Sequence, residues 1–153
     1  MLITRSLLSA LSAAAGQSPR LRKNRNFHAV DSAPAHRLLN ALEPESYVRP
    51  HRHLDSAKDE TMIVVRGKFG LVIFNHDGSV DSATAIEPAG EVIGVDIPHG
   101  TFHMILGLAP GSIFFEAKAG PYVPLAEAEL ASWAPAEGST GAGPYLDRMR
   151  MLF

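Results

Sequence analysis

The chain has 153 residues, 46% of them hydrophobic and 20% charged, a balance typical of one folded domain rather than a disordered or fibrous protein. Its 14 Lys and Arg and 16 Asp and Glu residues give a formal net charge of −2, so no overall field favours nucleic acid or an anionic membrane. The absence of cysteine excludes disulfides, thiolate metal sites and a cysteine nucleophile, and leaves nitrogen and oxygen to bind any metal.

Residues 1–16 are compatible with an export signal or with a short docked helix. A single cation precedes the apolar stretch, and serines interrupt that stretch. Leu7, Leu8 and Leu11 have the spacing of one helix face. Thr4 or Ser6 could cap the start of this helix. The pattern favours the docked helix, and the run is too short and too polar to span a membrane.

A basic and polar segment follows at residues 20–28. Four cations fall within six residues, and in an extended chain the even positions share one face. That face holds Arg22, Asn24, Asn26 and His28 and would line a polar pocket. A solvent-exposed arm without a partner is the alternative, and contact of the cations with phosphates is a third interpretation.

About eight short strands are predicted between residues 37 and 118. The Asp-Gly pair at residues 77–78 is a strong hairpin signal, because Gly supplies the positive φ angle of a tight turn. Short strands at this spacing indicate an antiparallel sandwich or barrel. The expected strands are 37–42, 47–53, 61–65, 69–74, 80–86, 91–97, 101–108 and 112–118.

The C-terminal part differs in composition. Residues 124–133 are helix-forming, with Pro124 in the tolerated first turn, and we expect this helix to close the barrel. Residues 137–144 contain three Gly together with Ser, Thr and Pro, which predicts a mobile loop before a short tail.

Three histidines and one glutamate form a candidate metal site. If residues 47–53 form a strand, His51 and His53 point the same way, because side chains alternate along a strand. Glu60 follows across a polar turn and could lie level with this pair on a neighbouring strand, whereas His103 must arrive from a distant one. Three nitrogens and one oxygen suit a divalent ion of iron, zinc, nickel or manganese, and an octahedral ion would keep positions open for water or substrate.

Strand parity places further polar groups near this site. Tyr47 and Arg49 share the parity of His51, and an inward Arg could bind a carboxylate or phosphate. Glu116 and Lys118 share one face of the last strand, where Glu116 could act as a general base or orient a ligating imidazole. An ion pair at the barrel mouth for Arg49 and a solvated position for Glu116 fit equally well. The candidate catalytic residues are Glu116 and Tyr47, and the candidate substrate-binding residues are Arg22, Asn24, Asn26, His28, Arg49 and Lys118.

The spacing around the histidines resembles the two motifs of the cupin superfamily. Residues 51–67 match the first motif as His-x-His, Glu and Gly, and residues 98–103 match the centre of the second as Pro-x-Gly-x-x-His. The chain departs from the pattern at Glu45, Val92 and Gly107, where the family has Gly, Gly and Asn. Six residues separate the His-x-His pair from the Glu, against three or four in the family.

Longer segments resemble the WbuC-type cupin-fold metalloproteins over almost the whole chain. The segments that carry this resemblance are 22–28, 36–42, 46–53, 111–122 and 133–138. It implies an all-β protein with the cupin double-stranded β-helix, or jelly-roll barrel, short N-terminal and C-terminal helices, and one bound metal. The implied single domain covers residues 1–153, with a helix and arm at 1–28, the barrel at 36–123, and a helix and tail at 124–153.

Two functions remain open. The first is a metal-dependent enzyme, an isomerase or epimerase, a hydrolase or an oxygenase, that acts on a small anionic sugar or sugar nucleotide. The resemblance places such an enzyme in bacterial surface-polysaccharide metabolism. The second is a non-catalytic carbohydrate-binding or sensor module that holds its ligand through the metal. Nucleic-acid binding through residues 20–25 is disfavoured by the acidic total charge.

The remaining expectations concern assembly and location. Residues 62–65 and 113–115 have apolar side chains for an outer sheet face, and cupins are commonly dimeric, so we expect a homodimer. We expect a cytoplasmic bacterial protein that contacts neither a membrane nor nucleic acid.

Overall fold

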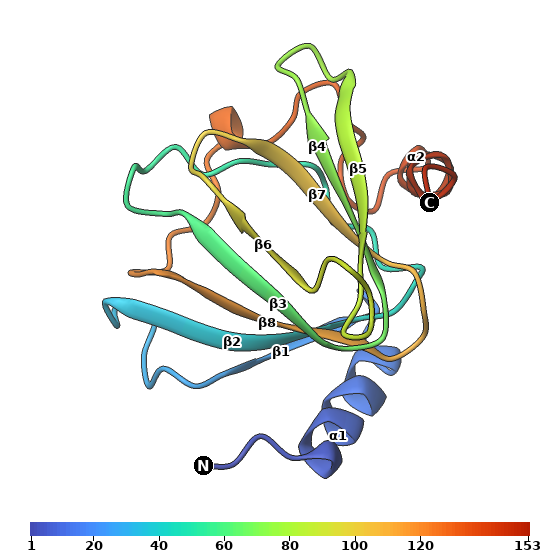
Figure 1. The fold of residues 1–153 in the computed structure, drawn as a ribbon. Helices are drawn as coiled ribbons and strands as arrows, with labels where there is room; N and C mark the ends of the chain where they lie inside the picture. The colour runs from blue at the N-terminus through green and yellow to red at the C-terminus, as the bar shows by residue number, and fades with distance from the viewer.

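Two antiparallel sheets form the frame of the protein in the computed structural model, which describes residues 1–153 (Figure 1). The larger sheet has the strand order β1-β2-β8-β3-β6 and the smaller one β5-β4-β7. The strands are β1 Arg22–Asn26, β2 Ala35–Leu42, β3 Glu60–Arg66, β4 Phe69–Phe74, β5 Val80–Ile86, β6 Gly94–Ile97, β7 Phe102–Gly107 and β8 Ser112–Ala119. The helices are α1 Arg5–Gly16, the 3-10 turn η1 Glu127–Glu129 and α2 Ala142–Arg150. The predicted all-β jelly-roll fold with short terminal helices is confirmed.

The inner faces of the two sheets meet in an apolar core. Phe69 of β4 and Phe114 of β8 pack edge to face, with ring centroids 5.1 Å apart. Met62 and Val64 of β3 face this pair, and β7 contributes Ile105. Burying each such side chain contributes roughly 1.5 to 3 kcal/mol to folding, so this core holds the barrel closed beneath the polar site described below.

Helix α1 lies on the outer face of the larger sheet (Figure 1). It starts after Thr4, whose side-chain oxygen accepts a hydrogen bond of 3.2 Å from the N–H of Leu7, as one of the two predicted caps. The helix buries Leu8, Leu11 and Ala15 against Leu39, Ala41 and Ile113 of the sheet. The predicted docked helix is therefore confirmed.

Two glycines allow tight connections between strands. Gly78 has a φ angle of +88° in the hairpin between β4 and β5, where the sequence predicted a turn. Gly67 has a φ angle of +77° between β3 and β4, and a Cβ atom there would collide with Ser112 of β8. The strand predicted at 91–97 starts later, at Gly94.

Residues 124–133 do not form the predicted helix beyond the short turn η1. The backbone of this segment pairs with residues 50–52 instead. The N–H of Ala131 donates to the carbonyl of Pro50, and the N–H of Arg52 donates to the carbonyl of Glu129. Backbone groups used in this pairing cannot also form a helical ladder, so tertiary contact overrides the local helix propensity.

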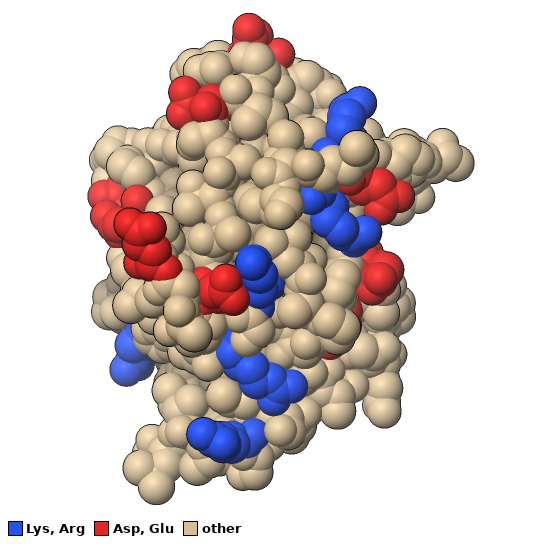
Figure 2. All heavy atoms as spheres, turned by 45° about the vertical axis from the view of Figure 1, so that its right-hand side comes forward, with Lys and Arg blue, Asp and Glu red and all other residues tan.

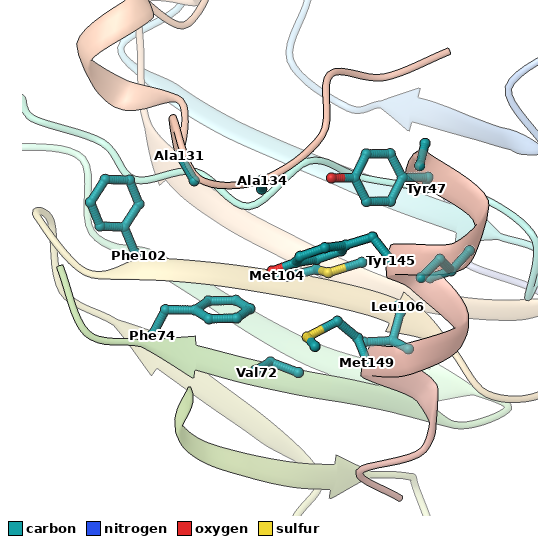
Figure 3. Packing of buried hydrophobic residues seen from close by; sticks show 12 residues of the cluster. Tyr47, Val72, Phe74, Phe102, Met104, Leu106, Ala131, Ala134, Tyr145 and Met149 are labelled. Carbon is teal, nitrogen blue, oxygen red and sulfur yellow. The ribbon is translucent and has the colours of Figure 1, made fainter. Parts of the chain in front are cut away.

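The segment predicted as a mobile loop and tail contains helix α2. Tyr145, Leu146 and Met149 of α2 pack into an apolar cluster with the smaller sheet (Figure 3). Pro144 lies in the first turn, where a helix tolerates proline, so the Gly and Pro content of 137–144 concealed a helix start. No helix in the structure is long and apolar enough to cross a membrane.

Residues 47–53 do not form the predicted strand either. Only His51 makes bridge contacts, one with His103 and one with Leu130. Pro50 has no N–H to donate, which shortens any ladder through this segment. The segment nevertheless runs between the start of β7 and residues 129–131, which position it from both sides.

Candidate metal centre

A pair of backbone hydrogen bonds brings His51 and His103 together. The N–H of His51 donates to the carbonyl of His103 at 3.0 Å, and the N–H of His103 donates to the carbonyl of His51 at 2.9 Å. The ring centroids lie 4.6 Å apart. His103 therefore reaches the His51 segment from β7, a distant strand, as the sequence required.

Hydrogen bonds on the far side of each ring fix how these two imidazoles can bind. The Nδ1 of His51 lies 3.0 Å from the carbonyl oxygen of Arg49, and the Nδ1 of His103 lies 3.0 Å from that of Thr101. A carbonyl oxygen only accepts, so Nδ1 carries the proton and Nε2 keeps its lone pair. Both rings thus present Nε2 as a metal-ligating atom.

Glu60, the first residue of β3, lies between two of the imidazoles. Its Oε1 is 3.0 Å from the Nε2 of His53, and its Oε2 is 3.1 Å from the Nε2 of His103. The potential ligand atoms of His51, His53 and Glu60 all lie within 4.8 Å of one another. The structure therefore groups three of the four proposed metal ligands, His51, His53 and Glu60, and places His103 beside Glu60.

Several of these atoms lack hydrogen-bond partners although they are buried. The Nε2 atoms of His53 and His103 and the Oε2 of Glu60 make no hydrogen bond of acceptable geometry. Leaving a buried polar atom unsatisfied costs roughly 1 to 3 kcal/mol. One divalent cation among them would satisfy all three, so the residues present fit a metal ion.

Electrostatics favour the protonation states that bind a cation. Burial, together with the nearby His103, lowers the pKa of His51 to about 3, so this imidazole is neutral at pH 7. Burial alone would raise the pKa of Glu60, but His103, His53 and Lys118 hold it well below its usual range. A neutral imidazole and a charged carboxylate are the forms that metal ions require.

Lys118 connects Glu60 to a second carboxylate. Its Nζ lies 2.7 Å from Oε1 of Glu60 and 2.7 Å from Oε1 of Glu116. Burial would lower the pKa of Lys118, but the two carboxylates raise it above its usual value. Burial raises the pKa of Glu116, whose Oε2 accepts a hydrogen bond of 2.7 Å from Asn40. Glu116 and Lys118 thus share the inner face of the sheet, as strand parity predicted.

Two adjoining cavities open beside this cluster. The smaller, of about 160 Å³, is lined by His51 and His53 and lies next to the candidate ligands. The other, of about 200 Å³, lies over the inner face of β1 and β2. Both are lined by His36, Lys118 and Tyr122, which therefore form their common wall.

The predicted polar face of the arm at residues 22–28 divides between two environments. Asn24, Asn26 and His28 line the second cavity. Arg22 lies apart from it, 2.8 Å from Glu137 and 2.9 Å from the carbonyl oxygen of Tyr47. For three of the four residues, the pocket-lining interpretation therefore fits better than the interpretation of a free arm.

Tyr47 and Arg49 point away from the cluster, contrary to the parity argument. The hydroxyl of Tyr47 donates to the carbonyl of Pro135 at 2.8 Å, and Arg49 donates to the carbonyl of Ala131 at 2.6 Å. Tyr47 packs in the apolar cluster with Tyr145 (Figure 3). Parity failed here because it holds only for a regular strand, and this segment is irregular.

Sequence reasoning missed several polar residues that line the cavities, among them His36, Asn40 and Tyr122. Each shares a strand or turn with residues that looked like ordinary core or loop positions. His36 and Asn40 alternate with buried apolar residues in β2, which was the available signal. Charged groups of both signs are interspersed over the face shown in Figure 2, in line with the mixed composition.

A family model described as a domain of unknown function, DUF6016, matches residues 3–86, more than half of the chain. The chain belongs to the DUF6016 family. No curated protein matches this DUF6016 member.

Solved structures resemble the DUF6016 chain in fold. KdgF from a Halomonas species has a TM-score of 0.53 at 17% identity, over 69% of this chain and 84% of that one. A cupin superfamily protein from Desulfitobacterium hafniense has a TM-score of 0.50 at 12% identity, over 64% and 76% of the two chains. A conserved Streptococcus pyogenes protein of unknown function has a TM-score of 0.51 at 11% identity, over 71% and 86%. At such identities the likeness establishes the cupin fold alone.

Proposed function

We propose that this DUF6016 protein is a metal-dependent enzyme that acts on a small polar molecule. Four side chains would hold one divalent transition ion: His51, His53, Glu60 and His103. The observation that carries the proposal is the set of buried Nε2 and carboxylate atoms that face one another without hydrogen-bond partners. Such a set is costly in a protein without a ligand and ordinary around a cation.

The chain's own residues would prepare this site. The bonds from Nδ1 to backbone carbonyls would orient His51 and His103, and Lys118 would hold Glu60 in place. When bound, the ion would supply Lewis-acid polarisation of a substrate oxygen or a lowered pKa of water. The donor set suits iron, zinc, nickel and manganese alike, so isomerisation, hydrolysis and oxygenation all remain compatible with it.

The resemblance to WbuC-type cupins supports a place in bacterial surface-polysaccharide metabolism, with a sugar or sugar nucleotide as substrate. The expectation that this ligand is anionic relied on guanidinium groups near the metal. Both candidates are occupied elsewhere, Arg49 by a backbone carbonyl and Arg22 by Glu137. The anionic ligand therefore receives no support from these two residues.

A non-catalytic binding module is the second candidate. Both carboxylate oxygens of Glu116 are engaged, one by Lys118 and one by Asn40, so the residue predicted as a general base has no free oxygen for that role. A module of this type would bind its ligand through the same cavities without turnover.

Elemental analysis of protein purified without added metal tests the metal site. We expect near-stoichiometric transition metal in the parent and at least roughly tenfold weaker binding in His51→Ala and His103→Ala, because each removes a ligating nitrogen that the pocket cannot replace. His99→Ala is the matched control, because this imidazole is exposed and contacts Asp59 at 2.8 Å. A metal-free parent, or full metal content in both variants, would contradict the proposal.

A homodimer and a cytoplasmic location stay predictions. Ile63 and Val65 are exposed on the outer face of β3 and could contribute to an interface of the expected kind. Ile113 cannot, because α1 covers it.

A further inference from the structure

The inner face of the larger sheet changes from apolar to polar across its strands. From β3 through β8 and β2 to β1, one row of register partners is Val64, Phe114, Asn40 and Asn24. The next row is Met62, Glu116, Leu38 and Asn26. The β3 end of both rows lies in the core, whereas the β1 end carries exposed amides. A third row, Glu60, Lys118 and His36, joins this face to the candidate metal ligands.

This polar half of the sheet lies at its β1 edge. The edge position alone does not explain why its inner face is open. Helix α1 covers the opposite face of β2 through Leu39 and Ala41, so these strands are firmly attached to the body of the protein. The inner face of this half borders the cavity of about 200 Å³, which is lined by three buried polar side chains, His28, His36 and Glu116. Burying polar groups beside an open cavity is costly unless they serve a ligand or each other.

The side chains of this wall are hydrogen-bonding groups that suit hydroxyls. Asn24 and Asn26 each offer an amide donor and a carbonyl acceptor, and Asn40, whose amide donates to Glu116, still offers its carbonyl oxygen. Asn24 and Asn26 make only one contact with each other, at 3.5 Å, so most of their capacity is free. At His28, Nδ1 accepts the N–H of Arg37 at 3.2 Å, which leaves Nε2–H as a donor.

The charges of the wall are compensated within the protein. Lys118 lies 2.7 Å from each of two carboxylates, Glu60 and Glu116. Asp31 also lines the cavity and would repel an anion. A ligand carrying a phosphate or carboxylate would therefore find no free cation in this cavity, and Lys58 of the adjoining cavity already donates to the carbonyl oxygen of Pro121 at 2.9 Å.

An aromatic ring stands where the two cavities meet. Tyr122 lines both and is 59% exposed. A flat ring beside amides and a carboxylate can stack on the C–H face of a sugar while the amides bind its hydroxyls. Three strand spacings of about 4.8 Å separate β3 from β1, roughly 14 Å across the sheet, which is room for more than one sugar ring.

We propose that the inner face of β1, β2 and β8 is a binding subsite for a neutral polyhydroxylated molecule, a sugar or polyol, that reaches the metal side past Lys118 and Tyr122. This inference rests on the proposed function, because it names the class of molecule presented to the metal. It replaces the anionic ligand expected from the sequence.

The test is an NMR titration of isotope-labelled, zinc-loaded protein. The neutral probes are maltose, lactose and L-rhamnose at millimolar concentration, and the charged probes are glucuronate and glucose 6-phosphate. We expect the neutral sugars to shift backbone amide signals of β1, β2 and β8 while those of α2 stay unchanged. We expect weaker shifts or none with the charged probes.

Variants locate the binding on the inner face. The double variant Asn24→Ala/Asn26→Ala changes exposed amides that folding does not need, and Glu116→Gln changes the buried carboxylate. The double variant should weaken sugar binding about tenfold or more, because several hydrogen bonds to the ligand are lost, and Glu116→Gln should weaken it less, because both oxygens of Glu116 already lie against Lys118 and Asn40. Arg25→Ala is the matched control, because this residue lies between the two asparagines on the opposite face of β1 and should leave the affinity unchanged.

Each outcome of these experiments either supports or refutes a proposal. The subsite is refuted if no neutral probe shifts these strands, if the charged probes bind more tightly, or if the double variant binds like the parent. The metal proposal is read separately, from elemental analysis of the same sample before zinc is added. If the protein holds metal but binds no sugar, only the subsite proposal is refuted. If it binds sugar but holds no metal, only the metal function is refuted.

Discussion

Lys118 is the single cation between the candidate metal ligands and the polar half of the sheet. It lies 2.7 Å from both Glu60 and Glu116, and its side chain is 22% exposed. Removing one partner of a buried ion pair leaves the other charge unsolvated, which costs more than the pair itself contributes. Lys118 therefore stabilises the protein by preventing repulsion between two carboxylates.

Lys118→Met should lower the free energy of unfolding by about 3 kcal/mol, since it leaves two buried carboxylates facing each other. Urea denaturation of chelator-treated protein measures this loss. Adding Glu116→Gln to the variant should recover part of it, because only one of the two carboxylates then remains charged.

Lys68→Met is the matched control for that experiment. Lys68 lies 3.2 Å from Glu87, but both side chains are 40% exposed. An exposed ion pair contributes only about 0 to 1 kcal/mol. Equal losses of unfolding free energy in Lys118→Met and Lys68→Met would show that the burial of Lys118 does not increase its contribution to stability.

At the scale of elements, helix α1 holds the edge of the larger sheet. Its buried residues pack on β2 and β8, and β1 lies beyond them with four of its five residues exposed. The strand β1 thus depends on its ladder with β2 and on α1 for its position. The proposed sugar subsite depends on the same contacts, because Asn24 and Asn26 belong to β1.

Leu11→Ala in α1 should lower the free energy of unfolding by roughly 2 to 4 kcal/mol, because it leaves a cavity against the sheet. Hydrogen exchange should also speed up in β1 and β2 relative to the smaller sheet. Urea denaturation and exchange mass spectrometry measure the two effects. Leu2→Ala, at a side chain that is 81% exposed, should change neither. A similar loss of stability in both variants would refute the view that α1 stabilises the sheet.

Hydrogen-bond pairing between elements also determined the structure of segments for which the local sequence pattern predicted a different one. The segment 124–133 has a helical composition, but residues 129–131 hydrogen-bond with residues 50–52 and thereby hold the His51 segment. The helix α2 starts in a Gly-rich stretch that reads as a loop. Local propensity differs between helix and loop by a few tenths of a kcal/mol per residue, which tertiary hydrogen bonds and burial readily exceed.

At the scale of the whole molecule, the candidate metal centre makes stability depend on pH. The pKa of His51 falls from 6.5 to about 3 on folding, so the folded state holds this ring neutral while the unfolded state takes up a proton below pH 6.5. The contribution of the neutral His51 ring to the free energy of unfolding is complete above pH 6.5 and is lost progressively as the pH falls toward 3. The lowered pKa of Glu60 acts in the same direction below its unfolded value of 4.5.

Chelator-treated protein should therefore become less stable between pH 6.5 and pH 5, by about 1.4 kcal/mol per pH unit for one proton. Urea midpoints measured across this range give the slope. His51→Gln lacks the titrating group and should show a flatter dependence. Identical slopes for parent and variant would mean that the pH dependence arises from other groups.

Much of the fold followed from local patterns. Alternation and turn residues predicted most of the eight strands, and the spacing in residues 51–67 and 98–103 resembled cupin motifs because metal ligands on strands need fixed intervals. Tyr47 and Arg49 were misplaced by the same logic, since one proline interrupts the strand on which their parity depended.

The convergence of His51 with His103, and of Lys118 with Glu60, was decided only by the folded sheets. Register and strand order set which side chains become neighbours, and here they join residues far apart in sequence, His51 with His103 and Glu60 with Lys118. The amino-acid pattern could supply the ligands and the jelly-roll because these depend on residue type and short spacing. The polar inner face of β1 and β2 required the register of three strands, which no single segment contains.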